Sequence, residues 1–136
     1  NLSLIKVLGS HWKNITFDEC KIVGVDFYKC EKIMHLNFYK CILQTCNFAD
    51  LNLKAGAFRQ SKLREVHFMG TDLTETDFTE TDLSGTIFHQ CNLFKADFRN
   101  AKNYSIDLQT NNLKKAKFSF PEAVNLLRCL DIEIED

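Results

Sequence analysis

The segment Thr-Asp-Leu-Thr-Glu-Thr-Asp-Phe-Thr-Glu-Thr-Asp-Leu-Ser-Gly, residues 71–85, repeats one five-residue pattern three times. Each unit begins with a small or β-branched residue and has a large apolar residue at its third position, which we call the central residue. A period of five fits neither the 3.6-residue repeat of an α-helix nor the two-residue repeat of a strand. We therefore expect the chain to turn within every unit and to stack on itself as an all-β solenoid.

Outward from this segment, the central residue recurs without interruption over thirteen units. These central residues are Phe38, Leu43, Phe48, Leu53, Phe58, Leu63, Phe68, Leu73, Phe78, Leu83, Phe88, Leu93 and Phe98. After a miss at Asn103, the run resumes at Leu108, Leu113 and Phe118. An earlier run keeps the same step one residue out of phase, with central residues Trp12, Phe17, Ile22 and Phe27. One inserted residue after Phe27 should therefore bulge from the coil.

The alternation of Phe and Leu predicts how the core is filled. With four sides per coil, like residues recur every twenty positions, and large and small side chains share a narrow interior. One side would stack Phe38, Phe58, Phe78, Phe98 and Phe118, and the opposite side Phe48, Phe68 and Phe88. We divide the chain into a lead-in over 1–11, a β-helix over 12–118 with a register shift between 28 and 35, and a C-terminal cap over 119–136.

Several units match the consensus A(D/N)LXX, and on this basis the chain resembles the pentapeptide-repeat proteins over roughly residues 10–118. The matching units are Thr71-Asp72-Leu73, Thr76-Asp77-Phe78, Thr81-Asp82-Leu83, Cys91-Asn92-Leu93 and Ala96-Asp97-Phe98. The resemblance implies a right-handed quadrilateral β-helix, here of about five coils. It also implies a bacterial protein related to the members that confer quinolone resistance or toxin immunity, which imitate DNA and bind DNA gyrase and topoisomerase IV.

The C-terminal residues predict a different element. Pro121 is well placed to open an α-helix, and Ala123, Leu126, Leu127 and Leu130 follow helical spacing. Residues 131–135 then alternate like a half-buried strand. We expect this segment either to cap the last coil alone or also to form a homodimer. The candidate cap and dimer residues are Val124, Leu127, Leu130, Ile132 and Ile134.

Charged residues occur in bands, and residues 71–86 carry five acidic and no basic residues. The five, Asp72, Glu75, Asp77, Glu80 and Asp82, should ring one whole coil, either as a solvated surface or as a site for a basic partner. B-DNA carries one charge per roughly 1.7 Å, so a rod of this length needs on the order of fourteen net negatives to imitate it. The net charge is −1, which argues against imitation by the whole rod.

The remaining residues give no sign of catalysis. Six cysteines show no C-x-x-C pair and four histidines do not converge, so we expect free buried thiols, no metal, no cofactor and no enzymatic activity. No apolar run is long enough to span a membrane, and the first residues lack a signal-peptide layout. We predict a cytoplasmic scaffold that binds an unidentified protein partner, without direct nucleic-acid or membrane binding. The alternative is a topoisomerase-binding protein that acts by partial imitation of DNA.

Overall fold

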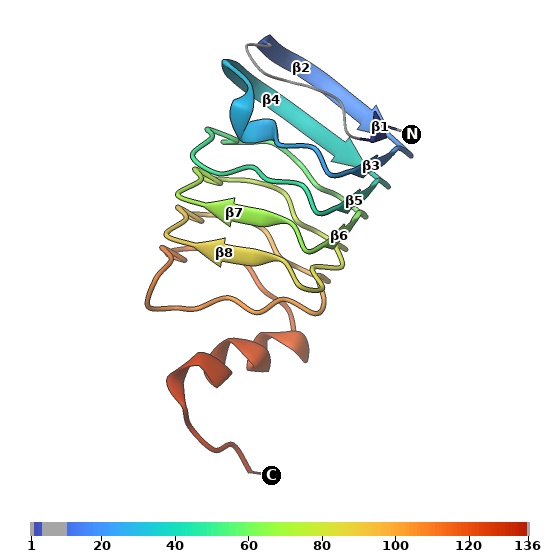
Figure 1. Ribbon diagram of the computed structural model, residues 1–136. Helices are drawn as coiled ribbons and strands as arrows, with labels where there is room; N and C mark the ends of the chain where they lie inside the picture. Colours follow the sequence, from blue (N-terminus) through green and yellow to red (C-terminus); the bar gives the residue numbers. More distant parts are fainter. Residues whose placement is uncertain (1, 4–10, 136) are drawn as a thin grey trace.

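The computed structural model describes residues 2–3 and 11–135, and it shows a β-solenoid whose coils lie one below another (Figure 1). Strand β1 (Leu2–Ser3) and the C-terminal helix lie at opposite ends of the stack. The all-β solenoid predicted from the five-residue period is therefore confirmed. Most of the predicted lead-in over 1–11 falls outside the described residues.

Eight short strands mark the most regular parts of the coil. They are β1 (Leu2–Ser3), β2 (His11–Asp18), β3 (Lys21–Val23), β4 (Lys32–Tyr39), β5 (Ile42–Gln44), β6 (Lys62–Arg64), β7 (His67–Met69) and β8 (Ile87–His89). All pairs are parallel, in the orders β1-β3-β5-β6, β2-β4 and β7-β8. Isolated parallel bridges continue these ladders as far as Lys117. Each coil is thus hydrogen-bonded to the next along its length.

The coil has four sides, which we name after one central residue of each. On the Phe38 side the central residues are Phe17, Phe38, Phe58, Phe78, Phe98 and Phe118, and on the Phe48 side they are Phe27, Phe48, Phe68 and Phe88. On the Leu43 side they are Ile22, Leu43, Leu63 and Leu83, and on the Leu53 side they are Trp12, Ile33, Leu53, Leu73, Leu93 and Leu113.

The phenylalanines form two columns of stacked rings inside the rod. Neighbouring rings of one column lie 4.6 to 5.3 Å apart and within 14° of parallel. Rings of the two columns meet edge to face at 5.5 to 6.1 Å. Both geometries are the favourable ones for aromatic pairs. The core therefore owes much of its regularity to the ten-residue recurrence of Phe.

The register changes once along the chain. Trp12 pairs with Ile33, an offset of 21, whereas Leu43 pairs with Leu63, an offset of 20. The 3₁₀-helix η1 (Phe27–Lys29) lies where the offset changes. The solenoid has about four turns, slightly fewer than the five predicted. Ile33 is also buried as a central residue, a role that the sequence pattern did not assign to it.

The last coil departs from the predicted pattern. The side chain of Asn103 is exposed and does not occupy the core position. The buried side chains of Tyr104 and Ile106 fill the interior instead. Leu108 was predicted to be a central residue, but it is only half-buried and lies in a turn. Tyr104 packs against Phe98 and Phe118, with ring centroids 6.1 and 5.6 Å away. A large aromatic ring can close the end of the core, which explains why the period is lost here.

The C-terminal prediction was partly wrong. The helix η2 (Glu122–Leu130) lies below the last coil, as Figure 1 shows, but it is a 3₁₀-helix and not an α-helix. Residues 132–135 form no strand, since a lone strand without a paired edge has no ladder partner. No helix of the described chain is long and apolar enough to cross a membrane.

Candidate protein-binding surfaces

The five acidic residues of the 71–86 band lie on three sides of the rod. Asp72 and Glu75 belong to the Leu53 side, Asp77 and Glu80 to the Phe38 side, and Asp82 to the Leu43 side. The Phe48 side of the same coil carries Ile87 and His89 in strand β8 and has no acid there. The prediction that the acids encircle the coil was therefore wrong, because the fourth unit of the coil lacks an acidic residue.

The three aspartates hold the turns that follow them. Asp72 accepts hydrogen bonds from the backbone N–H and hydroxyl of Thr74, at 3.0 and 2.6 Å. Asp77 accepts from the N–H of Thr79 at 2.8 Å. Asp82 accepts from the N–H and hydroxyl of Ser84, at 3.2 and 2.7 Å, in the same geometry. These three carboxylates therefore stabilise the turns of the coil. Glu75 and Glu80 are instead exposed at its corners.

Neighbouring coils offset part of this negative charge. Asp82 lies between Lys62 and Lys102 in its ladder, and Arg59 approaches Asp77 to 3.8 Å. Burial tends to raise the pKa of Asp82, but hydrogen bonds from Asn103 and Ser84 and the nearby Lys102 outweigh it and hold the pKa below its usual range. The carboxylate is therefore ionised at neutral pH and locally balanced.

The C-terminal segment carries a cluster of exposed apolar side chains. We call it the cap surface; it consists of Phe120, Val124, Leu127, Leu130, Ile132 and Ile134. Phe120 is 85% exposed and Ile134 is 54% exposed. Leu126 of η2, by contrast, packs against the core. Exposed apolar clusters of this kind are typical of surfaces that contact a partner.

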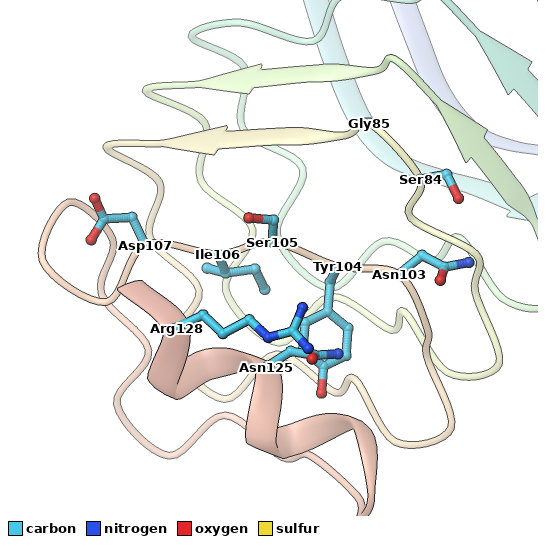
Figure 2. Close-up of a pocket in the computed structure, with 9 residues that line it drawn as sticks. All are labelled: Ser84, Gly85, Asn103, Tyr104, Ser105, Ile106, Asp107, Asn125 and Arg128. Carbon is cyan, nitrogen blue, oxygen red and sulfur yellow. The ribbon is translucent and has the colours of Figure 1, made fainter. Parts of the chain in front are cut away.

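A groove separates η2 from the last coil, and the break in the repeat at Asn103 was the one feature of the sequence that pointed to this place. It has a volume of about 700 Å³ and is lined mainly by polar residues. Figure 2 shows Asn103, Tyr104 and Asp107 of the last coil on one wall, with Asn125 and Arg128 of η2 opposite. Tyr104 is buried, and its hydroxyl has no hydrogen-bond partner among the described residues. The cap thus packs loosely on the coil above it.

Most of the described cysteines lie in the core. Cys30, Cys41, Cys46 and Cys91 are buried free thiols, and burial raises the pKa of Cys30 to about 11. Thiols of this kind are unreactive at neutral pH. Among the residues that the structure describes, no group of His, Cys, Asp or Glu could hold a metal ion.

A family model for the pentapeptide repeat region matches residues 25–98 and again residues 41–118. Together with the four-sided coil, this match shows that the chain belongs to the pentapeptide-repeat family. The two matches cover the regular part of the solenoid and leave out the cap. A comparison with curated protein sequences finds no match.

A comparison with solved structures finds similarities at low sequence identity. A trypsin-treated form of QnrB1, a plasmid-mediated fluoroquinolone resistance protein, is 14% identical, with a TM-score of 0.46 over 98% of this chain and 95% of that one. HetL, involved in heterocyst differentiation regulation in the cyanobacterium Nostoc sp. strain PCC 7120, is 20% identical, with a TM-score of 0.34 over 79% and 41%. A protein of the Arabidopsis thaliana thylakoid lumen is 19% identical, with a TM-score of 0.31 over 81% and 62%. At these values the similarities identify no function for this chain.

Proposed function

We propose that this chain is a non-enzymatic scaffold that binds other proteins and forms a homodimer through its C-terminal segment. The cap surface supports this proposal, because its six large apolar side chains lie in water on an element that is itself loosely packed. Pairing two cap surfaces would remove these side chains from water, at about 25 cal/mol per Å² of apolar area. The acidic residues Asp131, Glu133 and Glu135 lie among them and would stay at the rim of such an interface.

Sedimentation velocity over a range of protein concentrations tests the homodimer. We expect the wild-type chain to dimerise and the variant Leu127→Glu/Leu130→Glu to stay monomeric, because two buried carboxylates would oppose association. Met69→Glu is the matched control, since Met69 is also exposed but lies on strand β7, away from the cap. A wild-type chain that is monomeric at the highest concentration would refute the homodimer.

The alternative function is binding to a type II topoisomerase by partial imitation of DNA. The exposed carboxylates of Glu75 and Glu80 and the acidic C-terminal segment favour it, although basic neighbours balance the aspartates between them. A supercoiling assay with DNA gyrase, with and without a fluoroquinolone, tests this function. Inhibition or rescue at micromolar protein would support it, and neither effect would eliminate it.

A further inference from the structure

Six exposed lysines lie on the Leu53 side of the rod, which also carries three acidic residues, Glu31, Asp72 and Glu75. The lysines are Lys13, Lys32, Lys54, Lys95, Lys114 and Lys115. The neighbouring Phe38 side is more evenly balanced, with four basic and five acidic residues at the same positions of its units. The Leu53 side and the Phe38 side therefore differ in charge. The charge bands along the sequence did not show this difference.

These lysines have no partner in an ion pair within the described chain. On the Phe38 side, by contrast, Arg99 contacts Asp97 at 2.7 Å and Arg59 approaches Asp77. On the Leu53 side, the N–H of Lys95 donates to the carbonyl of Lys114 at 3.0 Å, so lysines of adjacent coils are stacked. Adjacent coils lie roughly 4.8 Å apart, and like charges at that distance repel. The ammonium group of Lys95 lies over the ring of Phe94, 5.4 Å from its centroid, but no carboxylate pairs with these lysines within the described chain.

The order of charges along the Leu53 side restricts the kind of partner. Lys13, Lys32 and Lys54 lie toward the N-terminal end, where the one carboxylate, that of Glu31, contacts His11 at 3.0 Å. Asp72 and Glu75 lie in the middle, and a second group of lysines lies toward the C-terminal end. A nucleic acid presents a uniformly negative backbone, which the central carboxylates would repel. A protein surface can instead present acidic, basic and acidic patches in turn, and such complementarity gives specificity.

We propose that the Leu53 side docks a protein whose surface carries two acidic patches with a basic patch between them. The acidic patches meet the two groups of lysines, and the basic patch meets Asp72 and Glu75. A hollow of about 200 Å³, lined by Ile33, Met34 and Ala55 among others, lies on this side and accepts one apolar side chain of the partner. The docking surface shares no residue with the cap surface.

Labelled peptides test this proposal by fluorescence anisotropy at low salt. One peptide has four glutamates, three lysines and four glutamates in blocks, and the other has the same composition in alternating order. We expect the blocked peptide to bind at least about fivefold more tightly to the full chain, because only its charges match the pattern. Equal affinity for both peptides, no binding of either, or tighter binding of a single-stranded oligodeoxynucleotide would overturn the proposal.

Charge reversal locates the binding surface. Lys95→Glu/Lys114→Glu/Lys115→Glu should weaken binding of the blocked peptide at least about tenfold. The matched control Lys21→Glu/Lys62→Glu/Lys102→Glu, on the Leu43 side, should change it less than about twofold. Equal losses in both triple variants would overturn the assignment to the Leu53 side. Should the first variant fail to fold by circular dichroism, Lys114→Gln/Lys115→Gln gives the same test with a smaller expected loss.

Discussion

The buried hydroxyl of Thr81 donates a hydrogen bond to the carbonyl of Phe58, 23 residues earlier, at 2.9 Å. Three other corner threonines, Thr71, Thr76 and Thr86, make the same bond to the coil above at 2.9 to 3.2 Å. Asn111 donates in the same way to Phe88. The inward corner thus favours a small residue with a hydrogen-bond donor, because the neighbouring carbonyl is shielded from water.

Thr81→Val keeps the shape of the side chain and removes this bond. We expect the free energy of unfolding to fall by about 1–2 kcal/mol, because the buried carbonyl of Phe58 loses a partner. Urea denaturation measures the change. Thr79→Val, at a half-exposed position of the same coil, should stay within about 0.5 kcal/mol of wild type. Equal losses in the two variants would show that the corner hydroxyl has no special role.

Asp82 should make stability depend on pH. Its folded pKa lies below the ordinary value of 3.8, so the native state favours the ionised form. The resulting stability is fully present above the unfolded pKa and is lost as pH falls below about 4. Asp82→Asn should therefore reduce the fall in melting temperature between neutral and acid pH, whereas Asp18→Asn, at an exposed position, should leave it unchanged. An identical pH profile for wild type and Asp82→Asn would contradict this account.

The residue pattern predicted the solenoid because a period of five fits neither an α-helix nor a regular strand. The same counting missed Ile33, since the insertion in η1 hides its phase from the sequence. The pattern showed that the repeat is broken at Asn103. It did not show that the side chains of Tyr104 and Ile106 fill the core there instead. Tyr104 enters the core because the five-residue repeat ends at this coil. Since the repeat stops there, it could not predict which side chain would be buried.

At the scale of elements, the junction between the last coil and η2 was the least predictable part. Helical spacing identified the helix, but its 3₁₀ geometry and the groove above it depend on packing that the pattern does not encode. The alternation over 131–135 indicated a strand, yet no strand forms without an edge to pair with. The proposed cap and dimer residues stay a prediction, because their role depends on a second copy.

Tyr104→Phe examines this junction directly. The hydroxyl of Tyr104 is buried without a partner, and burial, together with the charge of Glu122, raises its pKa. Removing an unsatisfied buried hydroxyl should raise the free energy of unfolding by up to about 1–2 kcal/mol while the ring still packs on Phe98 and Phe118. Thermal denaturation measures the effect. A clear loss of stability would mean that the hydroxyl makes a hydrogen bond at this junction.

At the scale of the whole molecule, the position of each charge is set by two coordinates, the coil and the side. The position of a residue in the sequence shows its coil but not its side. The acidic band over residues 71–86 was therefore expected to encircle one coil. In the structure it covers three sides, and the Phe48 side of that coil carries no acidic residue. The side becomes readable once the register is known, because each offset of 20 or 21 places two residues in one ladder. The insertion in η1 therefore decides which N-terminal lysines join the Leu53 side.

The stack of phenylalanines makes the rod a nearly one-dimensional structure, in which the cost of a core substitution depends on its coil. Phe78 is fully buried between Phe58 and Phe98, at 5.3 and 4.9 Å, and also meets two rings of the opposite column. Phe118 is half-buried and stacks on Phe98 at 5.0 Å, with Tyr104 beside it. In a solenoid, stability is a sum of units and their interfaces. A unit in the middle of the rod has an interface with the coil on each side, so a substitution there weakens two interfaces, whereas a substitution in the last coil weakens one.

We therefore expect Phe78→Leu to lower the free energy of unfolding by about 1–3 kcal/mol and Phe118→Leu by less than half as much. Guanidinium denaturation compares the two variants. Native-state hydrogen exchange should show the Phe78→Leu loss spread over the adjacent coils, while the Phe118→Leu loss stays near the last coil and η2. Equal losses and equal exchange patterns would mean that the rod unfolds as one cooperative unit, in which an end coil is held as firmly as a middle one.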